Sequence, residues 1–503
     1  MKTLVLGTGR SGLAATRYLL KQGRSVIVSD SRSSEEVQDS PNWSEFESLE
    51  EEHSGHVEWA FGGHPPELLE RCNEIVISPG ISLHVPFLAA ALKSGVTIRG
   101  EMELAYKACD RPLIAVTGTN GKSTTCSVLG TMFGKKGIVG GNIGTPLLDQ
   151  VQTLSSSVEW VVAEVSSFQL ETVHEFRPKI GILTNITPDH LDHHKDLDEY
   201  RIAKSRIFAQ MDESCTAIFC QDDESSRQMA QEVREGRLPE WIGGFPVPRR
   251  GGRPRVLTYS VAGPVENGVA LNDGQVVRYC SGQAEKLWAW DYPGLPGKAM
   301  ISNGLAAITA ALEAGLNSEE IQSALRRFQP LRYRMEVAGV VNGVTYINDS
   351  KATNIDSALA SARSVDGALA VIVGGKDKGV DYTGLAKGLK ERNGRVFLIG
   401  EAAEPIDKKL KELEFDNSEH SQTMERALHA ATAYLGGEGT VLLTTDHEDA
   451  MPQVAWARQH GDCRVSCLTL GHDNEAWTNP GFREVLRRSI VWSADKSAGA
   501  GAE

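Results

Sequence analysis

The chain has 503 residues, of which 41% are hydrophobic and 23% charged, a composition typical of a globular protein with two large or three smaller domains. Its formal net charge of −14 argues against nucleic acid or an anionic membrane surface as the main partner. The sequence contains no apolar run of about 18 residues, so no transmembrane helix is predicted. A glycine-rich turn interrupts the N-terminal segment, so we expect no signal peptide. The eight cysteines are scattered, which favours reduced thiols in a cytoplasmic protein.

Residues 1–108 are predicted to form a first α/β domain. An apolar run at 4–6 leads into the pattern GxGxxG at 7–12, and then a helix and a second strand that ends at Asp30. A helix that begins after such a turn offers free backbone N–H groups to a diphosphate, so the pattern indicates a nucleotide as readily as a tight turn without a ligand. The polar, acidic segment 33–60 is predicted to be a surface excursion. Two further strands are predicted, at 74–80 and 96–98.

A second glycine-rich loop carries a more specific signal. A buried strand at 112–117 runs into GTNGKSTT at 118–125, and a helical segment follows. In that context Lys122 can reach the β- and γ-phosphates of a nucleotide, and the Ser123 hydroxyl can bind Mg²⁺. The chain lacks the first glycine of the strict P-loop pattern, but the GKST core between a strand and a helix still predicts a triphosphate site.

This loop belongs to a second α/β domain, predicted at residues 109–329. Two segments, 160–165 and 180–185, read as buried strands, because they are apolar on both faces. The Gly- and Pro-rich segment 236–300 is predicted to be an irregular β excursion at the edge of this domain, and a helix is expected from Asn303 onward.

Three other places in this domain offer candidate ligands. Glu164 ends a strand, where α/β folds bind ligands, and is placed to hold Mg²⁺; the alternative is that its segment only caps a helix. The run NITPDHLDHH at 185–194 contains three histidines and two aspartates, which indicate a metal site, although the spacing matches no zinc motif. We expect His193 and His194 to be exposed, and Lys204, judged alone, to lie on the surface of a helix.

A third, mostly parallel α/β domain is predicted at residues 330–493, followed by a disordered tail at 494–503. Its predicted strands are 344–349, 368–373, 396–399, 441–443 and 465–470, and we expect the last two to complete the sheet ahead of a final helix at 482–492. Two polar, basic segments, NDSKATN at 348–354 and GGKDKG at 374–379, follow neighbouring predicted strands and form a plausible site for anionic groups.

Taken in order, six segments resemble the Mur ligase family of bacterial cell-wall synthesis. They are GTNGKST at 118–124, EVSSFQLE at 164–171, TNITPDHLDHH at 184–194, YRIAKSR at 200–206, NDSKATN at 348–354 and GGKDKG at 374–379. The resemblance implies a Rossmann-like N-terminal domain, a P-loop-like central ATPase domain and a Rossmann-like C-terminal domain. It also implies a cytoplasmic monomer that forms an amide bond with ATP, most similar to members that join D-glutamate to UDP-N-acetylmuramoyl-L-alanine through an acyl phosphate.

The resemblance also implies a set of contact residues for each ligand. The UDP substrate would contact Gly7, Gly9, Ser11, Gly12, Asp30, Ser31, Arg32, Asn142 and Gln169. ATP would contact Gly118, Thr119, Asn120, Gly121, Lys122, Ser123, Thr124, Asn303, Arg334 and Asp349, and D-glutamate would contact Lys351, Thr353 and Lys378. One Mg²⁺ ion would be held by Ser123 and Glu164, and a second by His190 and a carbamylated Lys204. The catalytic residues would be Lys122, His190 and Lys204.

The sequence departs from the family pattern in three places. Ala299 and Met300 replace a usual His-Asn pair, so an adenine contact would be lost, and Tyr333 replaces a usual histidine. From about residue 444 the family's small-residue stretch is missing, and the chain instead resembles the end of a trehalose-utilisation (ThuA-like) domain. Three alternative explanations for this segment are open: a gene fusion, an assembly error in the sequence, or divergence of the C-terminal tail.

The sequence leaves two other functions open. One is a ligase for a different amino acid, such as a folylpolyglutamate-type enzyme, although those enzymes lack a UDP-binding first domain. The other is a nucleotide-binding protein whose catalysis is impaired by its C-terminal segment.

Overall fold

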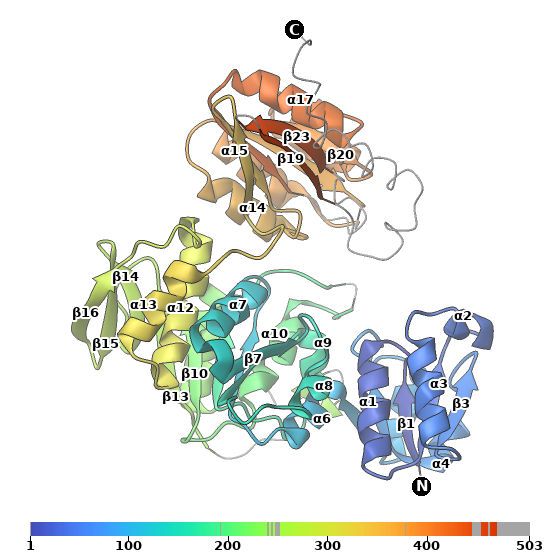
Figure 1. The fold of residues 1–503 in the computed structure, drawn as a ribbon. Helices are drawn as coiled ribbons and strands as arrows, with labels where there is room; N and C mark the ends of the chain where they lie inside the picture. The colour runs from blue at the N-terminus through green and yellow to red at the C-terminus, as the bar shows by residue number, and fades with distance from the viewer. Residues whose placement is uncertain are drawn as a thin grey trace. The chain divides into compact units, whose positions relative to one another are not determined.

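The computed structural model describes residues 2–191, 193–238, 252–377 and 379–444, and the backbone alone of residues 241–242, 245–246, 454–460 and 463–469. The chain divides into two compact units, one spanning Met1–Pro330 and one that begins at Leu331. Three large helix-flanked sheets, two in the first unit and one in the second, confirm the predicted α/β class (Figure 1). No helix among the described residues is long and apolar enough to cross a membrane.

The first sheet has five parallel strands in the order β3-β2-β1-β4-β5, the arrangement of a doubly wound fold. Its elements are β1 (Lys2–Leu6), α1 (Arg10–Lys21), β2 (Val26–Asp30), α2 (Ser34–Gln38), α3 (Trp43–Glu52), β3 (Val57–Phe61), α4 (Leu68–Arg71), β4 (Cys72–Ile77), α5 (Pro86–Lys93), β5 (Thr97–Gly100) and α6 (Glu101–Ala108).

The surface excursion predicted at 33–60 is wrong, because this segment supplies α3 and most of the edge strand β3. Phe46 and Leu49 lie three residues apart on α3, so they face the same side of the helix, and both are buried. Phe46 packs against the Trp59 ring of β3 at 5.9 Å between ring centroids. The glutamates around them occupy the solvent side of the helix, and their number hides its apolar face in the sequence.

The second sheet has nine strands in the order β16-β15-β14-β13-β10-β9-β6-β8-β7, and only the pairs at the β16 end are antiparallel. Its region comprises β6 (Leu113–Thr117), α7 (Lys122–Phe133), η1 (Gly134–Lys136), β7 (Gly137–Gly141), α8 (Leu147–Val151), β8 (Trp160–Glu164), α9 (Ser167–Leu170), β9 (Ile180–Leu183), α10 (Leu197–Ser205), η2 (Arg206–Phe208), β10 (Thr216–Cys220), α11 (Glu224–Glu235), β11 (Trp241–Ile242), β12 (Phe245–Pro246), β13 (Arg255–Ser260), β14 (Gly268–Asn272), β15 (Gln275–Cys280), β16 (Gln283–Ala289), α12 (Gly297–Glu313) and α13 (Ser318–Arg327).

Two consequences follow from this strand order. The excursion predicted at 236–300 does lie at the sheet edge, but it is regular over β13 to β16, which extend the sheet by four strands. Towards the opposite end of the strand order, β6 lies between β8 and β9 and is parallel to both. The carboxyl ends of these three strands therefore meet at one edge, which brings the loop after β6, the end of β8 and the loop after β9 together.

The third sheet has six strands in the order β17-β18-β22-β19-β20-β21, parallel except for β17. Its unit comprises β17 (Glu336–Val341), β18 (Val344–Asn348), α14 (Ile355–Ser364), β19 (Leu369–Gly375), α15 (Thr383–Arg392), β20 (Arg395–Gly400), α16 (Ala403–Glu412), β21 (Ser418–His420), α17 (Met424–Leu435), β22 (Gly439–Leu443), β23 (Val454–His460) and β24 (Cys463–Thr469).

The C-terminal strands depart from the prediction. The strand predicted at 441–443 lies in the sheet as part of β22. The one predicted at 465–470 belongs to β24, which among the described strands pairs with β23 alone, as an antiparallel hairpin. Two residues separate β23 from β24, and so short a connection permits only an antiparallel neighbour. The helix predicted at 482–492 and the tail predicted at 494–503 lie outside the described residues.

Buried carboxylates of α6 join the first sheet's region to the second within the first unit. Glu103 is fully buried and accepts hydrogen bonds from the backbone N–H groups of His174 at 2.9 Å and of Glu175 at 3.0 Å. Glu101, 1% exposed, accepts from the Leu148 N–H through Oε1 at 2.7 Å, whereas its Oε2 has no hydrogen-bond partner among the described residues. Burial raises the pKa of Glu101 from 4.5 to about 7, against the Leu148 hydrogen bond and with help from the charge of Asp149.

We predict that Glu101→Gln stabilises the protein more at pH 8 than at pH 5. Because the pKa is higher in the folded state, stability falls as the pH rises from 4.5 towards 7, a loss on the order of 3 kcal/mol for the full shift. Glutamine keeps the acceptor for Leu148 and removes the titration. Melting temperatures at both pH values test this, with the exposed Glu47→Gln as the matched loss of one charge. Equal effects at the two pH values would contradict the prediction.

Candidate functional site

The glycine-rich loop at 118–125 lies between β6 and α7, as predicted. Gly118 and Gly121 adopt positive φ angles of 145° and 88°, and a Cβ atom at either position would collide with Thr184 or Asn303. The loop therefore requires glycine at both places. Lys122 opens α7, and its Nζ donates to the carbonyl oxygens of Gly118 at 2.9 Å and Thr119 at 2.8 Å.

Lys204 meets the same loop from α10. Its Nζ donates to the Gly118 carbonyl at 2.9 Å and lies 4.2 Å from the centre of the Tyr200 ring. Because the side chain is only 1% exposed, the expectation of a surface lysine is wrong. Burial, reinforced by the charge of Lys122, holds the pKa of Lys204 well below its usual value, with Asp189 opposing the shift. Burial therefore favours the deprotonated, nucleophilic form of this amine more than it is favoured in an exposed lysine.

The segment after β9 fixes the phosphate loop by hydrogen bonds in both directions. The Asn185 side chain accepts from the Asn120 N–H at 2.9 Å and donates to the Asn120 carbonyl at 3.0 Å. Thr119 Oγ1 donates to the Thr187 carbonyl at 3.1 Å and accepts from the Thr187 N–H at 3.0 Å. These hydrogen bonds fix the conformation of the phosphate loop. They are possible because β9 lies next to β6.

Glu164 ends β8 beside this loop, and its two carboxylate oxygens differ in hydrogen bonding. Its side chain is 2% exposed, and Oε1 accepts from the Asn142 amide at 2.9 Å. Oε2 is buried and has no hydrogen-bond partner among the described residues. A buried carboxylate oxygen without a donor is costly in water-free surroundings, so this position fits a cation ligand.

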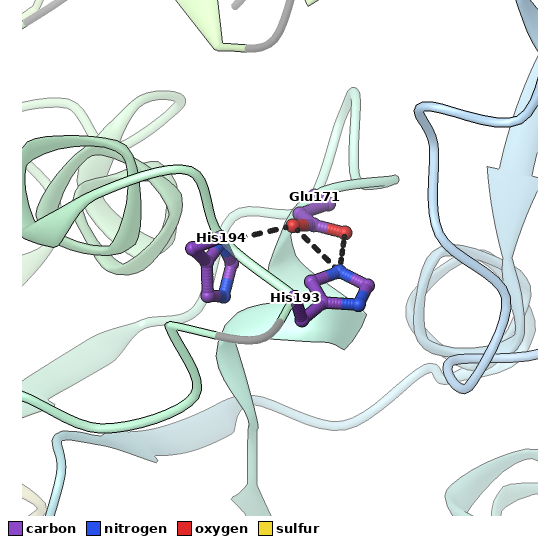
Figure 2. Close-up of side chains that lie close together, drawn as sticks. All are labelled: Glu171, His193 and His194. Atoms are coloured by element: carbon purple, nitrogen blue, oxygen red, sulfur yellow. Dashed lines mark hydrogen bonds and ion pairs between the residues drawn. The ribbon is translucent and has the colours of Figure 1, made fainter. Parts of the chain in front are cut away.

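The histidines of the loop after β9 do not behave alike. His190 has a positive φ of 54° and a half-exposed side chain, and its carbonyl accepts from the N–H groups of His193 and His194. Its ring lies edge-on to Phe168 at 4.9 Å between centroids. The expected exposure of His193 and His194 is wrong: the His194 side chain is fully buried, the His193 side chain is 12% exposed, and both face Glu171 (Figure 2).

The first glycine loop lies between β1 and α1, and a tight contact explains one of its glycines. A Cβ at Gly12 would collide with the Gly7 carbonyl, so α1 can begin this close to β1 only with glycine there. Gly9 and Ser31 are exposed and Ser11 is partly exposed. Asp30 is buried and accepts hydrogen bonds from Thr8 and from Arg32. Although burial raises it, these bonds hold the pKa of Asp30 well below its usual value.

Arg10 links this loop to the candidate substrate residues of the second sheet. Its guanidinium donates to the Gly144 carbonyl at 3.0 Å, in the segment that follows Asn142. Gln169 lies on the short helix α9, where its Oε1 accepts from the Ser166 N–H at 3.0 Å in a capping box. Gln169 is 5% exposed, so its amide is held in a fixed orientation.

In the second unit, Asp349 is the centre of the predicted site. It follows β18, is 5% exposed, and accepts from the Met335 N–H at 2.9 Å and from the Ser361 hydroxyl. Burial raises its pKa to about 6, against those hydrogen bonds and the charge of Arg334. The Lys351 side chain is exposed and Thr353 is partly exposed, two and four residues further on. Lys378 lies outside the described residues.

Asn303 and Met300 lie on the same helix, α12, in different surroundings. Asn303 approaches the phosphate loop, since its amide is what a Cβ at Gly121 would meet. Met300 is 6% exposed and packs in the apolar core, while Ala299 is exposed. The change from the usual His-Asn pair therefore places an apolar side chain in the core.

Three groups that support the site were not among the residues predicted from the sequence. Thr8 fixes Asp30, Asn185 fixes Asn120, and Glu171 faces two histidines. Asn185 carried a readable signal, because it ends the strand predicted at 180–185 and lies two residues beyond the end of β9. The roles of Thr8 and Glu171 depend on contacts between residues 22 positions apart, which no local sequence pattern encodes.

Three matched family descriptions cover most of the chain in order. Residues 1–100 match the Mur ligase MurD-like N-terminal domain, residues 116–245 the Mur ligase middle domain, and residues 333–445 the Mur ligase glutamate ligase domain. The UDP-N-acetylmuramoylalanine–D-glutamate ligase of Pelotomaculum thermopropionicum is 36% identical over 446 residues, covering 88% of this chain and 92% of that protein. That of Koribacter versatilis is 36% identical over 435 residues, covering 86% and 89%.

Solved structures are similar in fold. A pseudomurein peptide ligase type C from Methanothermus fervidus matches with a TM-score of 0.53 at 18% identity, covering 88% of this chain and 97% of that one. MurF from Acinetobacter baumannii matches with a TM-score of 0.52 at 16% identity, covering 75% and 88%. With relatives more than 30% identical over nearly their whole length, the chain belongs to the Mur ligase family.

Proposed function

We propose that this protein is the ATP-dependent ligase that adds D-glutamate to UDP-N-acetylmuramoyl-L-alanine during synthesis of peptidoglycan precursors. The observation that carries the proposal is the phosphate loop, where Lys122 and Lys204 converge on the Gly118 carbonyl beside Glu164. The substrate's carboxylate attacks the γ-phosphorus of ATP to give an acyl phosphate and ADP. The amine of D-glutamate then attacks the carbonyl carbon, and phosphate leaves as the amide forms.

Both partners of the first step are anions, so the site has to supply positive charge where they meet. Lys122 does so by moving from its two backbone carbonyls to the phosphates. Ser123 and Glu164 are the ligands proposed for one Mg²⁺ ion. Oε2 of Glu164, which has no hydrogen-bond partner in the described part of the chain, supports this assignment. When bound, Mg²⁺ neutralises charge on the phosphate oxygens.

We propose that Lys204 is carbamylated and, with His190, holds a second Mg²⁺ ion. An ordinary lysine is cationic and repels a metal ion. Here burial and Lys122 favour the neutral amine, which is the form that reacts with CO₂. The amine nitrogen bonds to the carbon of CO₂ and loses a proton, which leaves an anionic carbamate oxygen as a metal ligand.

The remaining ligand contacts are proposals of the same kind. The UDP substrate contacts Gly7, Gly9, Ser11, Gly12, Asp30, Ser31, Arg32, Asn142 and Gln169. ATP contacts Gly118, Thr119, Asn120, Gly121, Lys122, Ser123, Thr124, Asn303, Arg334 and Asp349, and D-glutamate contacts Lys351, Thr353 and Lys378. The bond from Arg10 to Gly144 supports the first set, since it holds the glycine loop near the Asn142 segment.

We assign most contacts of the UDP substrate to a domain at residues 1–108, most contacts of ATP to one at 109–329, and the D-glutamate contacts to one at 330–493. The separate sheets of these segments support the division. We further propose that the enzyme acts as a monomer in the cytoplasm, where ATP and nucleotide-linked sugars are made, and light scattering tests the oligomeric state.

Turnover of ATP by the purified protein tests the function. Phosphate release should require both UDP-N-acetylmuramoyl-L-alanine and D-glutamate. Phosphate release with another amino acid in place of D-glutamate would identify the protein as a ligase for that amino acid. ATP binding without turnover would identify a nucleotide-binding protein with impaired catalysis.

We predict that Lys122→Ala lowers kcat by about 10²–10³-fold, the usual cost of removing one group that stabilises transition-state charge. Lys136→Ala, an exposed lysine just beyond the same helix, is the matched control and should keep full activity. Steady-state kinetics and a melting curve of each variant are the measurements. A folded Lys122→Ala variant with undiminished kcat would rule out the proposed role.

Lys204→Ala should be inactive and should regain part of its activity in acetate, because a free carboxylate can replace the carbamate oxygen. Lys195→Ala, which removes an exposed lysine from the preceding segment, should be active with and without acetate. Labelled bicarbonate should exchange into the native protein but not into Lys204→Ala. Absence of that label from the active enzyme would contradict carbamylation.

From the sequence of the C-terminal segment we predict a weakened D-glutamate site. Residues 445–453 lie outside the described part of the chain. The sequence places His447, Glu448 and Asp449 where relatives have small residues, and each carboxylate would repel a dicarboxylic substrate by about 1 kcal/mol at contact distance in water. Replacing residues 444–503 with a family-typical ending should lower the KM for D-glutamate about tenfold or more, on the order of 1.4 kcal/mol. The KM for ATP is the internal control, and an unchanged KM for D-glutamate would show the segment to be harmless.

A further inference from the structure

Glu171, His193 and His194 bring three potential metal ligands together beside α9 (Figure 2). Glu171 directly follows α9, and the histidines lie on the loop between β9 and α10. His193 Nε2 lies 3.0 Å from Glu171 Oε2, and His194 Nδ1 lies 3.2 Å from Oε1. One ligand atom from each residue lies within 4.8 Å of the other two.

The hydrogen bonding of His194 is incomplete without a further group. Its side chain is fully buried, and Nε2 lies 2.9 Å from Ser167 Oγ. Nδ1 has no hydrogen-bond partner among the described residues, although Glu171 Oε1 is close. If Nε2 carries the proton and donates to Ser167, a nitrogen lone pair faces a carboxylate oxygen. If Nδ1 carries it, the N–H does not align with that oxygen. A cation between the two atoms removes the conflict.

We propose that Glu171, His193 and His194 bind a late first-row transition metal ion of the Zn²⁺ type, separate from the two Mg²⁺ sites. Two imidazole nitrogens and one carboxylate form a known zinc ligand set that leaves a fourth position for water. Ligands around a tetrahedral ion with bonds of about 2.0–2.1 Å lie roughly 3.3 Å apart, close to the separations from Glu171 to each histidine. Mg²⁺ prefers oxygen ligands and competes poorly for such a site.

Two features of His194 support ligation through Nδ1. Ligating histidines usually engage their other ring nitrogen in a hydrogen bond, as Nε2 does with Ser167. The His194 side chain is also fully buried, and burial favours the neutral ring that a metal binds. The bound ion would join the loop that carries His190 to the end of α9, which carries Gln169.

Calorimetric titration of the full-length, chelator-treated protein with Zn²⁺ tests the proposal, with excess Mg²⁺ present throughout. The native protein should bind one Zn²⁺ ion, and its melting temperature should rise with Zn²⁺ concentration. Removal of an outer partner of a ligating histidine costs about 10–100-fold in affinity, so His193→Ala, which removes a ligand, should cost at least ~100-fold. Glu171→Gln should show the same loss while preserving the shape of the side chain.

Two further variants distinguish this site from the proposed Mg²⁺ site and from binding at surface histidines. His190→Asn removes the proposed Mg²⁺ ligand with a residue that tolerates the positive φ there, and it should bind Zn²⁺ as the native protein does. His429→Ala removes an exposed histidine on α17 and controls for surface binding. The proposal fails if the native protein does not bind Zn²⁺, or if His193→Ala and Glu171→Gln bind it normally. It also fails if His190→Asn loses the binding.

Discussion

A single carbonyl oxygen, that of Gly118, receives the amines of two lysines from different helices, and the geometry of the phosphate loop depends on it. Lys122 reaches it from the first turn of α7, and Lys204 reaches it from α10. Two ammonium groups on one acceptor repel each other, so the arrangement is stable when one of them is neutral. The deeper one, Lys204, carries the lowered pKa. Of the two lysines, the buried Lys204 is therefore the one in which the neutral, reactive amine is favoured.

The loop is also ordered by hydrogen bonds within the protein itself. Asn185 satisfies both backbone groups of Asn120, and Thr119 and Thr187 exchange hydrogen bonds. A loop ordered in advance loses little entropy when the phosphates arrive, so more of the contact energy appears as affinity. Glu164 is prepared differently: Asn142 fixes one of its oxygens and leaves the other unpartnered among the described residues.

Much of this could be read from the sequence, and the misses share a physical cause. The strand–loop–helix units around Gly7 and Gly118 were predictable because a turn residue and an apolar period encode them locally. The burial of Lys204 and His194 was not predictable, because it depends on Gly118 and Phe168, which contact them from other segments. The acidic helix α3 was overlooked because two buried residues, Phe46 and Leu49, determine its position among many charged ones. For β24 an apolar run was correctly identified as a strand, but its neighbour was decided by the short connection to β23.

The hydrogen bonds around Asp30 bear on how one fold serves different nucleotides. In dinucleotide-binding relatives of this architecture, an acidic residue at the end of the second strand accepts from the hydroxyls of a ribose. Here Oδ2 accepts from the N–H and hydroxyl of Thr8, and Oδ1 accepts from the backbone and side chain of Arg32. A carboxylate offers about four lone-pair positions, so this one has little capacity left for a sugar. In this protein the carboxylate at that position ties Thr8 and Arg32 to the end of β2. In the bare protein Asp30 therefore offers few free acceptor positions to the ribose of a dinucleotide.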